Sequence, residues 1–173
     1  MKNRYTTRAL AYAGVLISLN VILTRFVSIP IGNLFRLSVG AVPTILAGVW
    51  LGPVYGGICG LLGDLIGCLV NGYAPNPFIT VSAVLMGLIP ALFCRFLLKR
   101  GSFRQSMLFF LPVLLVTFFL TSQGFTVLGL TQIYGMPFSA AFVSRLPQTF
   151  SLWALDSVLC SLLYSRIKQL QLY

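Results

Sequence analysis

Residues 54–71 read VYGGICGLLGDLIGCLVN, an apolar run that contains one carboxylate and regularly spaced glycines. A helix needs about 20 largely apolar residues to cross a membrane, and roughly 17 suffice for a short one. The glycines recur at intervals of 4, 3 and 4 residues: Gly56, Gly60, Gly63 and Gly67. They would share one face of the helix, and small residues on one face let a neighbouring helix approach closely. The stretch predicts a membrane-spanning helix packed within a bundle.

The rest of the chain has the composition of a membrane protein. Of its 173 residues, 58% are hydrophobic and 8% are charged, whereas a soluble domain carries roughly 25% charged residues. So few polar groups cannot form the surface of a soluble protein. Because this length suits a single domain, we predict one integral membrane domain over residues 1–173.

Apolar runs separated by charges and turn-forming residues predict six transmembrane helices. They lie near 8–27, 37–52, 54–71, 77–98, 106–128 and 139–166. Gly52-Pro53 marks the boundary between the second and third helices, since proline lacks an N–H donor and restricts the residue before it. The predicted fold class is an all-α membrane protein, with six transmembrane helices in a compact bundle.

The basic residues predict the orientation of this bundle. The net charge is +10, which in a soluble protein would suggest a nucleic-acid partner, but here the charges cluster at the ends of apolar runs and no such partner is predicted. With the N-terminus inside, nine basic residues lie on the inner side: Lys2, Arg4, Arg8, Arg95, Lys99, Arg100, Arg104, Arg166 and Lys168. Three lie on the outer side: Arg25, Arg36 and Arg145. Because inner loops carry the excess of Lys and Arg, both termini are predicted in the cytoplasm.

The three outer arginines oppose this orientation signal, so something other than topology should favour them. One interpretation is that their long side chains reach the outer lipid headgroups. The other is that they form a basic mouth that captures an anionic solute. We favour the second interpretation.

The residue inventory argues against catalysis. The chain has two acidic residues, Asp64 and Asp156, and no histidine, whereas general acid–base catalysis uses histidine or paired carboxylates. The sequence contains no phosphate-binding loop and no zinc-binding motif. Four cysteines lie inside apolar stretches without a C-x-x-C pair and are expected to be core residues: Cys59, Cys68, Cys94 and Cys160. We therefore predict no catalytic residue, no metal site and no cofactor, and favour binding and translocation.

Both carboxylates fall inside predicted membrane helices, where a charge normally faces the bundle interior with a partner. Asp64 lies in the outer half of the third helix, so it could pair with Arg25 or Arg36, or accept N–H groups of a ligand. Both roles stay open. Asp156 lies near the middle of the sixth helix, and the sequence gives no partner for it.

Aromatic residues near the predicted outer mouth add possible stacking surfaces. Tyr73 lies in the turn-forming connection NGYAPNP at residues 71–77, and Tyr134 lies in the last outer connection. Flat apolar walls with a few placed polar groups suit a planar heteroaromatic ligand. Anchoring at the membrane–water interface is the alternative for either tyrosine.

Several segments, in this order and spacing, resemble the folate-family S component of energy-coupling factor (ECF) transporters. They are LFRLSVGAVPTILAG at 34–48, LGPVYG at 51–56, GDLIG at 63–67, YGMPF at 134–138 and RLPQ at 145–148. The resemblance spans most of the chain. Two departures are TVLGL at 126–130, where the family carries an NTLWL-like stretch, and the absence of a late proline in the sixth helix, near Asp156.

The resemblance implies a six-helix subunit of the bacterial cell membrane that binds a vitamin from outside. It also implies docking on a separate module of one scaffold transmembrane subunit and two ATPases, which would supply the energy. Ala9 and Ala13 match the small-residue motif through which the family contacts the scaffold. Arg36, Asp64 and Arg145 fall at positions similar to the family's own Arg, Asp and Arg.

Folate fits this residue set chemically, because its pterin edge is rich in N–H donors and its glutamate tail carries two carboxylates. A carboxylate such as Asp64 suits the pterin edge, and arginines suit the tail through charge-assisted hydrogen bonds. Another vitamin, riboflavin or pantothenate, remains an alternative. A membrane enzyme or a structural subunit is a third possibility, for which the needed carboxylates or histidines are lacking.

Overall fold

A computed structural model of the chain describes residues 7–31, 35–72, 74–97 and 103–170. Its elements in chain order are α1 (Thr7–Arg25), β1 (Ile29–Ile31), β2 (Phe35–Leu37), α2 (Ala41–Leu51), α3 (Pro53–Asn71), α4 (Pro77–Leu97), α5 (Phe103–Phe118), the π-helical η1 (Phe119–Thr126), α6 (Val127–Tyr134) and α7 (Phe138–Leu170). Because α5, η1 and α6 follow one another without a break, they form one long rod. The described residues therefore form six helical rods, as the sequence predicts.

The helices have the character of membrane spans. Four of them are long and apolar enough to cross a membrane: Thr7–Arg25, Pro53–Asn71, Pro77–Cys94 and Phe110–Gln132. α2 is apolar but shorter, with 11 residues. Large apolar side chains such as Leu10, Phe26 and Leu69 are 67–78% exposed on the outside of the bundle. Such a surface is stable against lipid, which is as apolar as the side chains themselves.

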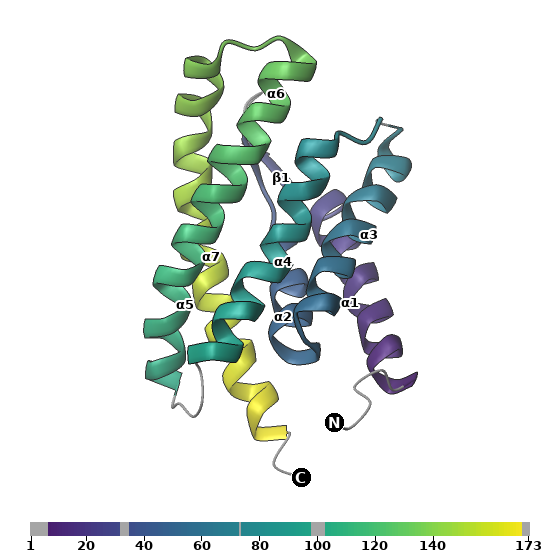
Figure 1. Cartoon of the computed structure of the whole chain (residues 1–173), viewed down its shortest axis with the longest axis vertical. Coiled ribbons are helices and arrows are strands. Elements are labelled where there is room, and N and C mark those ends of the chain that lie inside the picture. The colour runs from purple at the N-terminus through teal and green to yellow at the C-terminus, as the bar shows by residue number, and fades with distance from the viewer. Residues whose placement is uncertain (1–6, 32–34, 73, 98–102, 171–173) are drawn as a thin grey trace.

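α4 lies at the centre of the arrangement (Figure 1). On one side it contacts α2 and α3, and on the other side it contacts the rod of α5, η1 and α6. The start of α1 and the end of α7 lie at the same end of the bundle (Figure 1). Successive rods run in alternating directions, so that α1, α3 and α6 all run away from the end that holds the start of α1 (Figure 1).

The beginning of the second helix differs from the prediction. A helix was expected over 37–52, but α2 begins at Ala41. Residues 35–37 instead form β2, which pairs antiparallel with β1 so that Pro30 lies opposite Arg36. A three-residue strand has too few positions to show a period in the sequence, and its hydrogen bonds depend on a partner elsewhere in the chain. β2 also contacts α7, so the hairpin belongs to the bundle.

The predicted break between the second and third helices is confirmed at Gly52. This residue has φ +120° and ψ 164°, a conformation that side chains with a Cβ rarely adopt. Pro53 then opens α3 at a position where its missing N–H costs no helical bond. The backbone conformation at Gly52 thus lets α2 and α3 fold back on each other as separate helices.

The close helix approach predicted from the glycine spacing is also confirmed. A Cβ added at Gly60 would collide with the backbone carbonyl of Ala83 in α4. A Cβ at Gly56 would collide with Gly48 of α2 and with the carbonyl of Gly87 in α4. Three helices therefore meet at backbone contact, which fixes one wall of the bundle interior.

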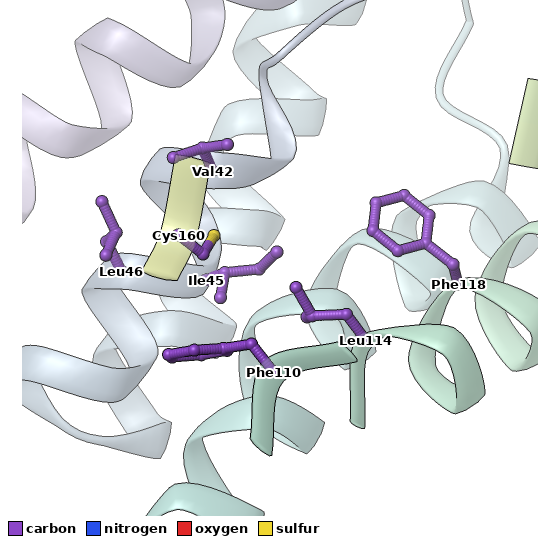
Figure 2. Close-up of a cluster of buried hydrophobic side chains, with 7 residues drawn as sticks. All are labelled: Val42, Ile45, Leu46, Phe110, Leu114, Phe118 and Cys160. Carbon is purple, nitrogen blue, oxygen red and sulfur yellow. The ribbon is translucent and has the colours of Figure 1, made fainter. Parts of the chain in front are cut away.

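A buried apolar cluster joins α2, α5 and α7. Figure 2 shows the side chains of α2 opposite those of α5. The cluster consists of Val42, Ile45, Leu46, Phe110, Leu114, Phe118 and Cys160. Cys59, Cys94 and Cys160 are buried, as expected for core residues, and Cys68 is partly buried. Phe118 belongs both to this cluster and to the lining of the cavity described below. The core thus supports one side of the candidate site.

Candidate functional site

A cavity of about 220 Å³ lies inside the bundle, and α1, α2, α3, α4, η1 and α7 contribute to its lining. Both acidic residues of the chain reach it, together with two arginines: Asp64, Asp156, Arg25 and Arg145. Its apolar walls include Ile79, Met86, Phe118 and Leu152. Charged side chains inside a membrane bundle are costly and usually mark a substrate site. An apolar cavity with a few converging polar groups is the usual form of a small-molecule site.

Arg25 and Asp64 form a pair on the wall of this cavity. Arg25 Nη2 lies 3.9 Å from Asp64 Oδ1, and the Thr80 hydroxyl donates a hydrogen bond of 2.7 Å to Asp64 Oδ2. Gly67 makes room for the pair, because a Cβ there would collide with the guanidinium of Arg25. The sequence allowed Arg25 or Arg36 as the partner of Asp64, and the described side chains show the pair with Arg25. The pair joins the end of α1 to α3 and α4.

A single face of α7 lines the cavity over its length. Arg145, Gln148, Leu152 and Asp156 are spaced by 3, 4 and 4 residues, so they lie on one side of the helix. No acidic side chain pairs with Arg145 among the described residues, since Asp64 pairs with Arg25 and Asp156 makes no ion pair. Arg145 therefore offers the cavity a guanidinium whose charge no side chain in the described part of the chain neutralises.

Asp156 is the least satisfied polar group of the site. Its side chain is fully buried, and neither carboxylate oxygen has a hydrogen-bond partner among the described residues. The neighbouring hydroxyls are engaged elsewhere: Ser157 donates to the Trp153 carbonyl and Ser161 donates to the Ser157 carbonyl. A buried carboxylate without partners is strongly unfavourable, so this position requires an explanation from function.

The π-helical segment supplies a row of polar side chains that sequence reasoning missed. Thr126 Oγ1 lies within hydrogen-bond distance of two oxygens, the Thr121 carbonyl five residues earlier at 3.0 Å and Ser82 Oγ of α4 at 3.2 Å, and its single O–H can donate to either of them. Ser82 Oγ donates in turn to the Thr121 carbonyl at 3.1 Å. The wider turn of η1 thus presents Thr121, Ser122 and Thr126 to the cavity. π-helical turns are frequent at functional sites, and the polar run TSQGFT at 121–126 within an apolar stretch was the available signal.

The structure brings three of the predicted binding residues, Arg25, Asp64 and Arg145, to one cavity. Arg36 lies in β2, but its side chain falls outside the described residues, as does the side chain of Tyr134 at the end of α6. Tyr73 lies outside the described residues altogether. The part that each of these residues takes in binding stays a prediction.

The two alanines predicted to contact a partner differ in exposure. Ala9 is half-buried, whereas Ala13 is only 3% exposed and therefore packs within its own chain. Gly14, the next residue, is exposed, and a Cβ added there would meet nothing within 4 Å. The predicted docking contact thus lies on a helix that has one face in the bundle and one face open.

Comparison with known proteins places this architecture in a family. The model of the ECF-type riboflavin transporter S component matches residues 4–169. The folate transporter FolT of Clostridium novyi (strain NT) is 28% identical over 138 residues, which are 78% of this chain and 75% of that protein.

Solved structures show the same relationship. The crystal structure of FolT bound with folic acid is similar with a TM-score of 0.69 and 27% identity, covering 91% of this chain and 93% of that one. The S component of a bacterial ECF transporter has the same fold, with a TM-score of 0.73 at 22% identity over 95% of this chain and 97% of that one. With the family model matched along nearly its whole length, the chain belongs to the family of ECF-type riboflavin transporter S components.

Proposed function

We propose that this S component captures folate in the cavity between α1, α3, η1 and α7, and hands it through the membrane when docked on an ATP-driven module. Two relatives support folate as the ligand: the folate transporter of Clostridium novyi and the FolT structure bound with folic acid, at 28% and 27% identity. The observation that carries the proposal is the guanidinium of Arg145, which lines the cavity without an acidic partner in the part of the chain that the structure describes.

The chemistry of the cavity suits a ligand with an anionic end and a flat ring. Carboxylates of the glutamate tail would neutralise Arg145 through charge-assisted hydrogen bonds. Arg25 is already close to Asp64. A tail carboxylate that contacts Arg25 would therefore share this guanidinium with Asp64. Apolar walls such as Met86 and Phe118 suit the flat aromatic part of the molecule. Arg36, Tyr73 and Tyr134 remain proposed contributors to the mouth of the site.

Riboflavin is the second candidate, because the matching family model carries its name. Riboflavin has a flat ring but no carboxylate, so it would leave Arg145 in the cavity without a counter-charge. Pantothenate has a carboxylate but no aromatic ring for the apolar walls. Folate provides both features, which is why we place it first.

We further propose that the end of the bundle that carries Arg25 faces outward, with both termini in the cytoplasm of a bacterial cell. The excess of basic residues, nine against three, supports this orientation. The partners would be one scaffold transmembrane subunit and two ATPases, contacted through the region of Ala9 and Ala13. This chain carries no phosphate-binding loop motif, so ATP hydrolysis is assigned to the partners.

A ligand panel on the purified protein tests the proposal. Folate, riboflavin, pantothenate and thiamine would be titrated separately by calorimetry, and small molecules released by denaturing the protein would be identified by mass spectrometry. We expect tight binding of folate and much weaker binding of the others. Tight binding of another vitamin without folate binding would refute the choice of ligand.

A further inference from the structure

We propose that Asp156 is the residue that recognises the donor-rich end of the ligand. It would accept hydrogen bonds from the N–H groups of the pterin edge. The ligand would then lie along α7, with its ring at Asp156 and its anionic tail at Arg145. The choice of folate rests on the proposed function, whereas the role of Asp156 rests on the structure of the cavity.

The carboxyl group of Asp156 lacks hydrogen-bond partners among the described residues. Asp156 lines the cavity, is fully buried, and has no partner on either oxygen among the described residues. Protonation would remove the charge but would leave an O–H donor and a carbonyl oxygen without partners, which is also unfavourable. The described side chains supply no partner, and the cavity is the side from which a ligand can reach both oxygens. A carboxylate is satisfied by groups with N–H or O–H donors.

The hydrogen-bond donors nearest to Asp156 along α7 are already used by other acceptors. Ser157 Oγ donates to the Trp153 carbonyl at 2.6 Å, and Ser161 Oγ donates to the Ser157 carbonyl at 2.7 Å. Trp153 Nε1 donates across to the Leu111 carbonyl of α5 at 2.8 Å. All three donors are thus directed away from Asp156, which leaves it open toward the cavity.

Asp156 differs from Asp64, the other acidic residue of the site, in its hydrogen-bond partners. Asp64 already accepts the hydroxyl of Thr80 and lies close to the guanidinium of Arg25. It therefore has protein partners before any ligand arrives. Asp156 has no such compensation, so a donor-rich ligand gains more by binding there.

The spacing of Arg145 and Asp156 along α7 fits an elongated ligand. Arg145 and Asp156 lie on the same face, 11 positions apart, which corresponds to about 16 Å along a helix. Leu152, between them, also lines the cavity and provides an apolar surface. This order of guanidinium, apolar wall and carboxyl group matches a molecule in which an aromatic linker separates a donor-rich ring from an acidic tail. Folate has this order of groups.

The test pairs a change in the protein with a change in the ligand. Folate and its 2-desamino analogue, which lacks the exocyclic donor of the pterin edge, would be titrated into wild-type protein and into Asp156→Asn. In wild-type protein the analogue should bind about 10- to 100-fold more weakly, as expected for a lost hydrogen bond to a charged group. In Asp156→Asn this difference should shrink to less than about threefold, because one neutral amide oxygen replaces the two oxygens of the carboxyl group.

Two matched variants complete the test. Asp64→Asn should preserve the difference between folate and the analogue, and Ser157→Ala should bind both ligands as the wild type does. Equal discrimination in wild-type protein and Asp156→Asn would overturn the proposal, and loss of discrimination in Asp64→Asn instead would assign the role to Asp64. Since the decisive comparison is between two ligands on one folded protein, a stability change in a variant does not mimic it.

Failure of the proposed function has a different signature. If the wild type binds another vitamin and no folate, Asp156→Asn should still lower the affinity for that vitamin by about tenfold or more. An unchanged affinity for whichever vitamin binds would overturn the role of Asp156.

Discussion

Arg25, the last residue of α1, lies 3.9 Å from Asp64 of α3, measured from Nη2 to Oδ1, on the wall of the cavity. Gly67 leaves the space that the guanidinium occupies, one helical turn beyond the carboxylate. The pair therefore depends on a glycine that the spacing in α3 already suggested as a site of close approach. It links the position of α1 to the electrostatics of the site.

Removing the carboxylate of this pair should destabilise the protein. In Asp64→Ala, Arg25 would lose its counter-charge while remaining largely buried, so we expect the ligand-free protein to lose about 1–3 kcal/mol of stability. Thermal unfolding in detergent measures this loss. The double variant Arg25→Ala/Asp64→Ala should recover part of it, because no uncompensated charge remains. Additive losses in the double variant would show that the two side chains do not interact.

Replacing Gly60 should weaken the packing of α3 against α4. In Gly60→Ala the added methyl group would collide with the Ala83 carbonyl, and we expect a loss of about 1–3 kcal/mol from the overpacked contact. The matched control is Gly14→Ala, where a Cβ meets nothing within 4 Å. That variant should unfold at the wild-type temperature or slightly above it. Similar melting temperatures for both variants would contradict the backbone contact between α3 and α4.

Removing the unpaired arginine should weaken ligand binding. In Arg145→Ala we expect folate affinity to fall by about 1.5–3 kcal/mol, the value of a hydrogen bond to a charged group. The dimethyl ester of folate, which lacks the tail charges, should be affected much less. Arg8→Ala, which removes an exposed arginine at the start of α1, serves as the control and should bind normally. Unchanged affinity in Arg145→Ala would indicate that this side chain reaches the lipid headgroups instead.

The docking prediction separates transport from binding. A bulky residue at Ala9 should impair vitamin uptake by cells that contain the complete transporter, while ligand binding to the purified chain stays intact. Ala13 is 3% exposed, so Ala13→Leu should also lower the melting temperature of the isolated chain by overpacking. Normal uptake with Ala9→Leu would argue against this face as the contact with the scaffold.

The proposed orientation can be tested by labelling from outside the cell. A cysteine at Ala74, an exposed residue between α3 and α4, should react with a membrane-impermeant thiol reagent on intact cells. A cysteine at Ser102, in the predicted inner connection, should react only after the cells are opened. The unsubstituted chain controls for its native cysteines, three of which are buried. The reverse pattern would place Arg25 and Asp64 near the cytoplasmic side.

The sequence by itself determined the membrane setting, the six rods and the break at Gly52. These features depend on local properties: the length of apolar runs, the conformational freedom of glycine and the fixed geometry of proline. The glycine spacing in α3 likewise predicted close packing, because helical periodicity alone puts those residues on one face. The order and spacing of segments along the chain likewise carry the resemblance to ECF S components.

Only the tertiary structure decided how the polar groups meet. It chose Arg25 as the partner of Asp64, paired residues 29–31 with 35–37, and placed Asp156 on the cavity with no partner among the side chains that the structure describes. The ion pair and the burial of Asp156 depend on distances between segments far apart in the chain, and on which groups water and lipid cannot reach. Helical periodicity fixes the face on which a residue lies, but the partners across that face are set by how the helices cross.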